Sequence, residues 1–197
     1  MARIWCVTVD VKTLIVCMGN EHVCDDGIGA RVGRVLADLP LPSNVAVITI
    51  QKLRFELLDD LAGVDSLILV DALATGGEVG QCTVVDVTNH PSSLASGDCA
   101  HQMLVGQILE LARYVACGDE RRPVTIAGIE GKQFLRFGDF SEEVLAAVPR
   151  LVDLILLVVG ARLQARNMVK EVCRRLTCAE QAQARSSSGV CADVLSL

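Results

Sequence analysis

The order of apolar and polar residues predicts short buried strands alternating with amphipathic helices along most of the chain. Five apolar runs of strand length are apolar at nearly every position, which indicates strands buried on both faces. Four other segments repeat apolar residues every three or four positions, as helices do. The predicted strands are residues 14–18, 45–50, 66–70, 81–87 and 124–127, and the predicted helices are residues 27–39, 55–61, 100–116 and 141–159.

This alternation is typical of the α/β class. We expect a three-layer α/β/α domain in which a mostly parallel, five-stranded twisted sheet carries helices on both faces. One antiparallel strand is expected: residues 81–87 are predicted to form a hairpin with 66–70, because turn residues such as Gly76 and Gly77 lie between them. Ser141 is predicted to be the N-cap of the last helix.

Composition predicts three parts of unequal character. We expect an N-terminal extension over residues 1–12, one α/β domain over 13–160, and a basic tail, helical or partly disordered, over 161–197. The tail contains six Lys/Arg against three Asp/Glu, although the whole chain has a net charge of −6. The total of 197 residues suits a single domain with such an appendage.

Charge and composition also limit the partners. A net charge of −6 and an aromatic content of 3% argue against a nucleic-acid partner, which would need basic and stacking surfaces. No apolar run approaches the about 20 residues of a membrane span, so no membrane partner is expected. Nine cysteines do not suggest a disulfide framework and favour a reducing compartment. We therefore expect a cytoplasmic protein, and we expect it to be a monomer.

Three polar positions are expected at the carboxyl ends of the strands, where parallel sheets bind ligands. Asp25 and Asp26 follow the first strand, Asp71 follows the third, and His101 begins the long helix at 100–116. Each has a structural alternative: the adjacent aspartates can cap a helix, Asp71 can form a turn, and His101 can be a core histidine. Together, however, two carboxylates and one imidazole suit a divalent transition metal such as nickel or zinc.

Competing site types fit less well. The spacing Gly27-x-Gly29-x-x-x-Gly33 is one residue too long for a dinucleotide loop, and the aspartates would repel a pyrophosphate. The sequence has no H-E-x-x-H, G-x-S-x-G or C-x-x-C motif. The three glycines are instead expected to let the helix approach the sheet or another backbone closely.

Four motifs, taken in order, resemble the hydrogenase maturation endopeptidases. They are Gly19-Asn20-x4-Asp25-Asp26-Gly27-x-Gly29, Leu69-Val70-Asp71-Ala72, His101-Gln102 and Gly128-Ile129-Glu130. The resemblance covers roughly residues 13–160 and implies a single α/β/α domain. It also implies an endopeptidase that removes a short C-terminal extension from the precursor of the [NiFe] hydrogenase large subunit after nickel insertion.

The resemblance further implies roles for individual residues. Asp26 and Asp71 take the positions of the metal-contacting and catalytic acids, and His101 takes the position of the third metal ligand. Asn20 and Asp25 match positions that shape the loop. Nickel would arrive bound to the substrate and serve as the recognition signal, and other divalent ions can occupy such a site in crystals. The sequence leaves open whether the metal activates water or the carboxylates do, as in an aspartyl protease.

Two other functions remain as alternatives at this point. A non-catalytic chaperone on the same fold would bind the metal or the precursor and release no peptide. A nucleotide-binding α/β domain is the third hypothesis, and the glycine spacing and the acidic pair count against it.

Overall fold

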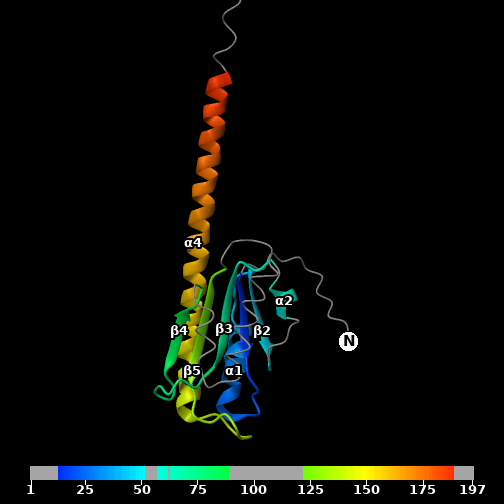
Figure 1. The fold of residues 1–197 in the computed structure, drawn as a ribbon, viewed down its shortest axis with the longest axis vertical. Helices are drawn as coiled ribbons and strands as arrows, with labels where there is room; N and C mark the ends of the chain where they lie inside the picture. Colours follow the sequence, from blue (N-terminus) through cyan, green and yellow to red (C-terminus); the bar gives the residue numbers. More distant parts are fainter. Residues whose placement is uncertain (1–12, 52–56, 62, 89–121, 189–197) are drawn as a thin grey trace, which may run out of the picture. The chain divides into compact units, whose positions relative to one another are not determined.

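The computed structural model describes residues 13–51, 57–61, 63–88 and 122–188. Within the compact unit that ends at Ile155, they form one five-stranded sheet with helices packed on it (Figure 1). The strand order is β2-β1-β3-β5-β4. Three of the neighbouring pairs are parallel, and β4 alone runs antiparallel, against β5. The predicted fold class is therefore confirmed. The strands are β1 (Thr13–Met18), β2 (Val45–Ile50), β3 (Ser66–Leu73), β4 (Cys82–Asp86) and β5 (Val124–Glu130).

The predicted hairpin between the third and fourth strands is wrong. Both sides of β3 pair in parallel, with β1 on one side and β5 on the other, so β4 is left to pair with the outer side of β5. The strand β3 also continues to Leu73, so Asp71 lies inside the strand and is paired in register with Gly128 of β5.

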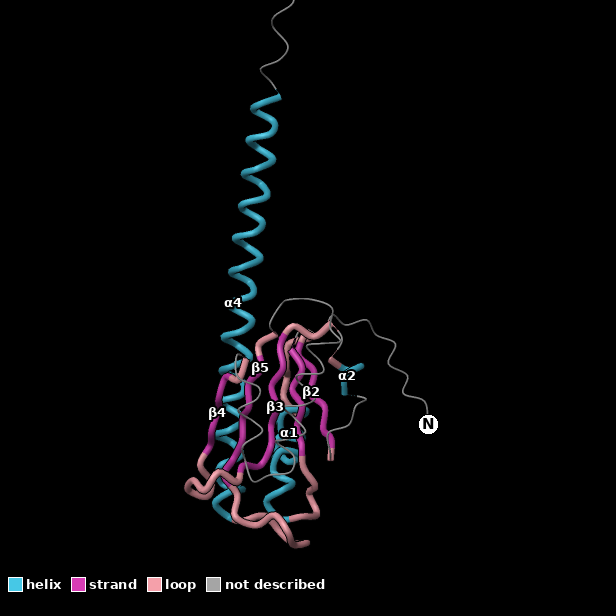
Figure 2. Tube along the Cα trace, viewed as in Figure 1, coloured by secondary structure: helices cyan, strands magenta, loops and turns pink. Residues whose placement is uncertain are grey.

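Alternate residues of β1 point to opposite faces of the sheet. Figure 2 shows the strands of this sheet in magenta and the helices in cyan. Leu14 and Val16 belong to a core cluster with Leu57 and Leu61, the region of the short helix α2 (Leu57–Asp60). Cys17 points the other way, toward the helix α1 (Ile28–Ala37). The neighbouring interior strands β1 and β3 are buried at every position, as expected for strands covered on both faces.

The helix α1 lies against the sheet almost backbone to backbone. A Cβ placed on Gly29 would be 2.1 Å from the carbonyl oxygen of Met18 and 2.7 Å from that of Val70. Only glycine fits this approach, so the predicted role of the glycines in close helix packing is confirmed at this position. The contact fixes the start of α1 over the junction of β1 and β3.

The last helix, α4 (Glu142–Ser188), is longer than the predicted 141–159. The chain divides into two compact units, Met1–Ile155 and Leu156–Leu197, and α4 contributes to both. Within the first unit its buried residues recur at helical spacing, which makes this part of α4 a core helix. They are Val144, Ala147, Val148, Leu151, Val152 and Ile155. The predicted helix at 100–116 and the extension at 1–12 lie outside the described residues.

One helical stretch in the described part of the chain, Glu142–Ala165, is long and apolar enough to cross a membrane by length and composition. The criterion is an 18-residue window with at most two charged residues. Because it tolerates these charges, the window is longer than the short uninterrupted apolar run expected from the sequence. A core helix meets the same criteria, and 39% of the window is buried in this structure. The stretch is therefore weak evidence for a membrane span.

Candidate functional site

The candidate site lies at the carboxyl ends of β1 and β3, two neighbouring interior strands of the sheet. After β1 the chain forms β2 on one side of β1 and then crosses to form β3 on the other side. The direction of strand addition therefore reverses between β1 and β3, which makes this point the topological switch point of the sheet. Residues 19–27, here called the acidic loop, follow β1 and end in the short 3-10 helix η1 (Cys24–Gly27). Such a junction is where open α/β sheets bind ligands.

The acidic loop holds Asp26 in place through its own backbone. The N–H of Asn20 donates to Oδ2 of Asp26 at 2.9 Å, and Oδ1 of Asn20 accepts from the N–H of His22 at 3.1 Å. Gly19 has φ +132°, and a Cβ there would be 2.0 Å from the carbonyl oxygen of Asp26. A side chain at position 19 would therefore displace Asp26 from the strand end.

Asp71 is the second carboxylate of the site, and its side chain is buried. The residue is 7% exposed, and Oδ1 accepts from the N–H of Ala72 at 2.8 Å. Burial raises the pKa of Asp71 to about 8; the Ala72 hydrogen bond opposes this rise, and the negative charge of Asp26 adds to it. The structure thus places Asp26 and Asp71 close enough for their charges to interact.

This donor set is chemically suited to a divalent cation. Two neighbouring carboxylates repel each other, and a bound cation would relieve the repulsion and favour both charged forms. Among the described residues there is no group of three His, Cys, Asp or Glu side chains that could hold a metal ion. The third predicted ligand, His101, lies outside the described residues.

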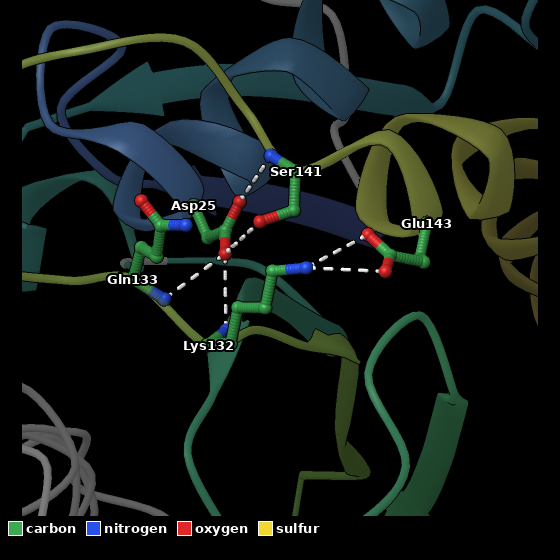
Figure 3. A network of polar contacts seen from close by, with 5 residues as sticks. All are labelled: Asp25, Lys132, Gln133, Ser141 and Glu143. Carbon is green, nitrogen blue, oxygen red and sulfur yellow. Dashed lines mark hydrogen bonds and ion pairs between the residues drawn. The ribbon is translucent and has the colours of Figure 1, made fainter.

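Asp25, adjacent to Asp26, has a different environment (Figure 3). It is fully buried, and its carboxylate accepts four hydrogen bonds from residues that follow β5. The N–H groups of Lys132 and Gln133 donate to Oδ2, each at 3.0 Å. Ser141 donates its N–H to Oδ1 at 2.7 Å and its hydroxyl to Oδ2 at 2.9 Å. Burial alone would raise the pKa of Asp25, but these hydrogen bonds lower it below its ordinary value.

The alternative in which Asp25 caps a helix does not hold, whereas Ser141 occupies the N-cap position of α4, as predicted. The N-cap positions of η1 and α1 are Val23 and Gly27, which have no polar side chain to cap a helix. The Asp25 carboxylate instead bonds residues 131–141, here called the 131–141 loop. The hydroxyl of Ser141 donates to Asp25, although its carbonyl oxygen still accepts the first helical bond, from Leu145. No local sequence signal could have paired residues 116 positions apart.

The backbones of the two loops are joined as well. Asp25 N–H donates to the carbonyl oxygen of Gln133 at 3.0 Å, and Cys24 N–H donates to that of Gly138 at 3.2 Å. Val23 and Gly138 form an isolated parallel bridge. Cys24 itself has a left-handed φ of 39°, which non-glycine residues seldom adopt. The acidic loop is thus held from both its start, at Gly19, and its end, at Asp25.

A cavity of about 220 Å³ opens beside the acidic loop, between this loop, the side of α1 and the carboxyl end of β2. The exposed Arg34 of α1 forms an ion pair with Oε2 of Glu21. Oε1 of Glu21 is buried and has no hydrogen-bond partner. No sequence pattern predicts this pair, because Glu21 and Arg34 lie 13 positions apart. The lining residues are Gly19, Asn20, Glu21, His22, Ala30, Arg34, Thr49, Ile50 and Gln51.

Glu130, at the end of β5, organises the turn that follows β3. Its carboxylate accepts from the hydroxyl of Thr75 at 2.8 Å and from the N–H groups of Gly76 and Gly77 at 2.8 and 3.2 Å. Since Glu130 is buried, these bonds supply the partners that a buried carboxylate requires.

The cysteines described near the site are poor candidates for a nucleophile. Cys17, Cys24 and Cys82 are free thiols, and the first two are buried. Burial raises the pKa of Cys17 to about 12, so its thiol stays protonated. Cys17 therefore behaves as a small apolar residue.

Comparison with known proteins identifies relatives that match most of the chain. The family model described as hydrogenase maturation protease matches residues 31–158, so its match begins just after the acidic loop. A protein of Methanocaldococcus jannaschii, provisionally described as a hydrogenase maturation protease, is 31% identical over 149 residues. That alignment covers 73% of this chain and 93% of the relative.

Solved structures share the fold. The hydrogenase maturating endopeptidase HybD of Escherichia coli superposes with a TM-score of 0.70 at 22% identity, over 77% of this chain and 93% of HybD. The [NiFe] hydrogenase maturation protease HybD of Thermococcus kodakarensis gives a TM-score of 0.62 at 26% identity, over 75% of this chain and 98% of its own. In both cases the chain covers nearly all of the solved structure.

Proposed function

This chain belongs to the hydrogenase maturation protease family, and we propose that it removes the C-terminal extension of a [NiFe] hydrogenase large-subunit precursor after nickel insertion. Family membership implies a hydrolase that acts on peptide bonds. The proposal of nickel-dependent C-terminal cleavage rests on one observation. The carboxylates of Asp26 and Asp71 interact at the switch point of the sheet.

In this proposal nickel belongs to the substrate. Carboxylate and imidazole groups are suitable nickel ligands, so Asp26 and Asp71, with His101, would contact the ion when the precursor presents it. A bound nickel ion supplies a Lewis acid that can polarise the scissile carbonyl. A precursor without nickel would offer these residues nothing to bind, and cleavage would therefore depend on completed metal insertion.

The residues of the chain have two possible tasks at the scissile bond. As ligands, Asp26 and Asp71 would position the precursor through its metal. As general base and acid, they would take a proton from the attacking water and deliver one to the leaving amine. Water is the proposed nucleophile, because Cys17 is buried and protonated and no serine-hydrolase or metalloprotease motif is present.

The decisive experiment uses precursor with and without nickel. We expect mass spectrometry to detect loss of a C-terminal peptide from the nickel-loaded form alone, after incubation with the full chain. No loss of a peptide from a matched, loaded precursor would refute the protease. Binding of the precursor without cleavage would instead support the chaperone alternative.

Asp26→Asn separates the two tasks. The amide oxygen of asparagine can still accept the Asn20 N–H, so the acidic loop should keep its form. If Asp26 is a ligand, the variant should lose nickel-dependent binding of the precursor together with cleavage. If it is a general base, binding should persist while cleavage falls at least a hundredfold. Asp38→Asn, at the exposed end of α1, is the matched control; unchanged cleavage by Asp26→Asn would exclude Asp26 from the site.

We also propose that the protein acts in the cytoplasm and that it is a monomer. The free thiols of Cys17, Cys24 and Cys82 support the first point, because a reducing compartment keeps thiols unpaired. Fractionation of the native cells and light scattering of the purified chain test these two points.

A further inference from the structure

The 131–141 loop exposes large apolar side chains beside the candidate site. Leu135 is 96% exposed and Phe137 is 86% exposed. These values are high for large apolar residues, and an exposed apolar cluster on a folded protein commonly marks an interaction site. Arg136, also exposed, lies between them in the chain.

The backbone that carries these side chains is held firmly. Before Leu135, the N–H groups of Lys132 and Gln133 donate to the Asp25 carboxylate, and the carbonyl oxygen of Gln133 accepts from Asp25 N–H. After Phe137, the carbonyl oxygen of Gly138 accepts from Cys24 N–H. Both ends of the segment 133–138 are therefore tied to the acidic loop, while its middle projects into solvent.

The anchoring also fixes where the apolar side chains lie. Their backbone is bonded to Cys24 and Asp25, immediately before Asp26, and Figure 1 shows the β5–α4 connection and the start of α1 at the same end of the sheet. Leu135 and Phe137 therefore lie on a segment bonded to the residues directly before Asp26, where a protein presenting a peptide bond to Asp26 can reach them. Fixed backbone with exposed apolar side chains costs little conformational entropy when a partner docks.

From this arrangement we infer that Leu135 and Phe137 form a docking surface for the folded precursor, contacting an apolar patch beside its C-terminal extension. The inference rests on the proposed function. It adds that the enzyme recognises the folded body of its substrate as well as the metal and the scissile segment. A few large apolar side chains commonly supply most of the affinity at such surfaces.

The test compares Leu135→Ser/Phe137→Ser with the wild-type chain on nickel-loaded, folded precursor. We expect KM to rise at least tenfold and kcat to change less than twofold, because the substituted residues do not touch the scissile bond. The dissociation constant of the precursor should rise by the same factor. Leu135→Phe/Phe137→Leu, which keeps the apolar character, should restore KM, and an unchanged Tm verifies the fold. Leu157→Ser, at a leucine 69% exposed on α4, is the control.

Each result bears on one of the two proposals. Normal cleavage with an unchanged KM and dissociation constant in the double serine variant would overturn the docking surface and leave the protease intact. A wild-type dimer that the same substitutions convert to a monomer, with KM unchanged, would identify a second copy of the chain as the occupant. If the wild-type chain binds the precursor without cleaving it, the proposed protease activity is refuted. The docking surface is then tested by the dissociation constants of the precursor for the wild type and the double serine variant. If it does not bind, both proposals fail.

Discussion

The carboxylate of Asp25 accepts two hydrogen bonds from Ser141, one from the backbone N–H at 2.7 Å and one from the hydroxyl at 2.9 Å. This contact joins the first turn after β1 to the first residue before α4, 116 positions along the chain. Because Asp26 is the next residue, the same contact that closes the fold also fixes the position of a candidate ligand.

Asp25→Asn should destabilise the fold. Asparagine has one acceptor oxygen where the carboxylate has two, so its amide group would face either the Ser141 N–H or the donors on Oδ2. We expect the free energy of unfolding at pH 7 to fall by about 2–3 kcal/mol, measured by chemical denaturation. Asp153→Asn, at an exposed position of α4, should change it by less than about 0.5 kcal/mol.

The effect of Asp25→Asn should also depend on pH. The folded pKa of Asp25 lies below its unfolded value, so its stabilising contribution is present above the unfolded pKa and is lost as pH falls. The difference between wild type and variant should therefore shrink below about pH 4. A difference that stays constant into acid would contradict the hydrogen-bonded carboxylate.

Asp71→Asn should stabilise the metal-free protein at neutral and alkaline pH. The folded pKa of Asp71 is raised to about 8, so between the unfolded value and pH 8 the folded state holds a proton that the unfolded state has released. Stability of the wild type therefore falls with rising pH across this window, by up to about 1.4 kcal/mol per unit, and the variant avoids that loss. Chemical denaturation of both proteins at pH 5 and pH 8, in the presence of a chelator, measures this loss of stability. If the difference in unfolding free energy between wild type and variant is the same at both pH values, the raised pKa of Asp71 is refuted.

Gly29→Ala should weaken the packing of α1 on the sheet. The new Cβ would lie 2.1 Å from the Met18 carbonyl oxygen, and both atoms belong to backbone that cannot move aside easily. We expect a loss of about 3 kcal/mol in the free energy of unfolding. Gly160→Ala is the control, because a Cβ there meets nothing within 4 Å; it should leave Tm unchanged or raise it slightly, since alanine favours helix.

Cys17 should resist thiol reagents in the native protein. Its thiol is buried and, with a pKa of about 12, stays protonated. Alkylation followed by peptide mapping should label Cys17 in denaturant alone, whereas the half-buried Cys82 should be labelled earlier. Native labelling of Cys17 at the rate of Cys82 would show that β1 opens more readily than its full burial indicates.

The sequence alone determined the class of the fold and the place of the acidic loop. Strand and helix patterns depend on residues only a few positions apart, so the apolar runs located five strands and α1. The order of a strand, two aspartates and a glycine-containing helix was enough to put Asp26 at a strand end, where α/β folds bind ligands.

Tertiary structure decided which strands pair and what each aspartate does. The antiparallel β4 pairs with β5 because β1 and β5 occupy both sides of β3, a fact that no local pattern contains. Asp25 and Asp26 are chemically identical neighbours in the sequence. They differ in their surroundings. The buried Asp25 side chain accepts hydrogen bonds from N–H groups of the 131–141 loop, whereas Asp26 lies near the buried Asp71. Burial and long-range hydrogen bonds set the state of a carboxyl group, and both arise only when distant segments meet.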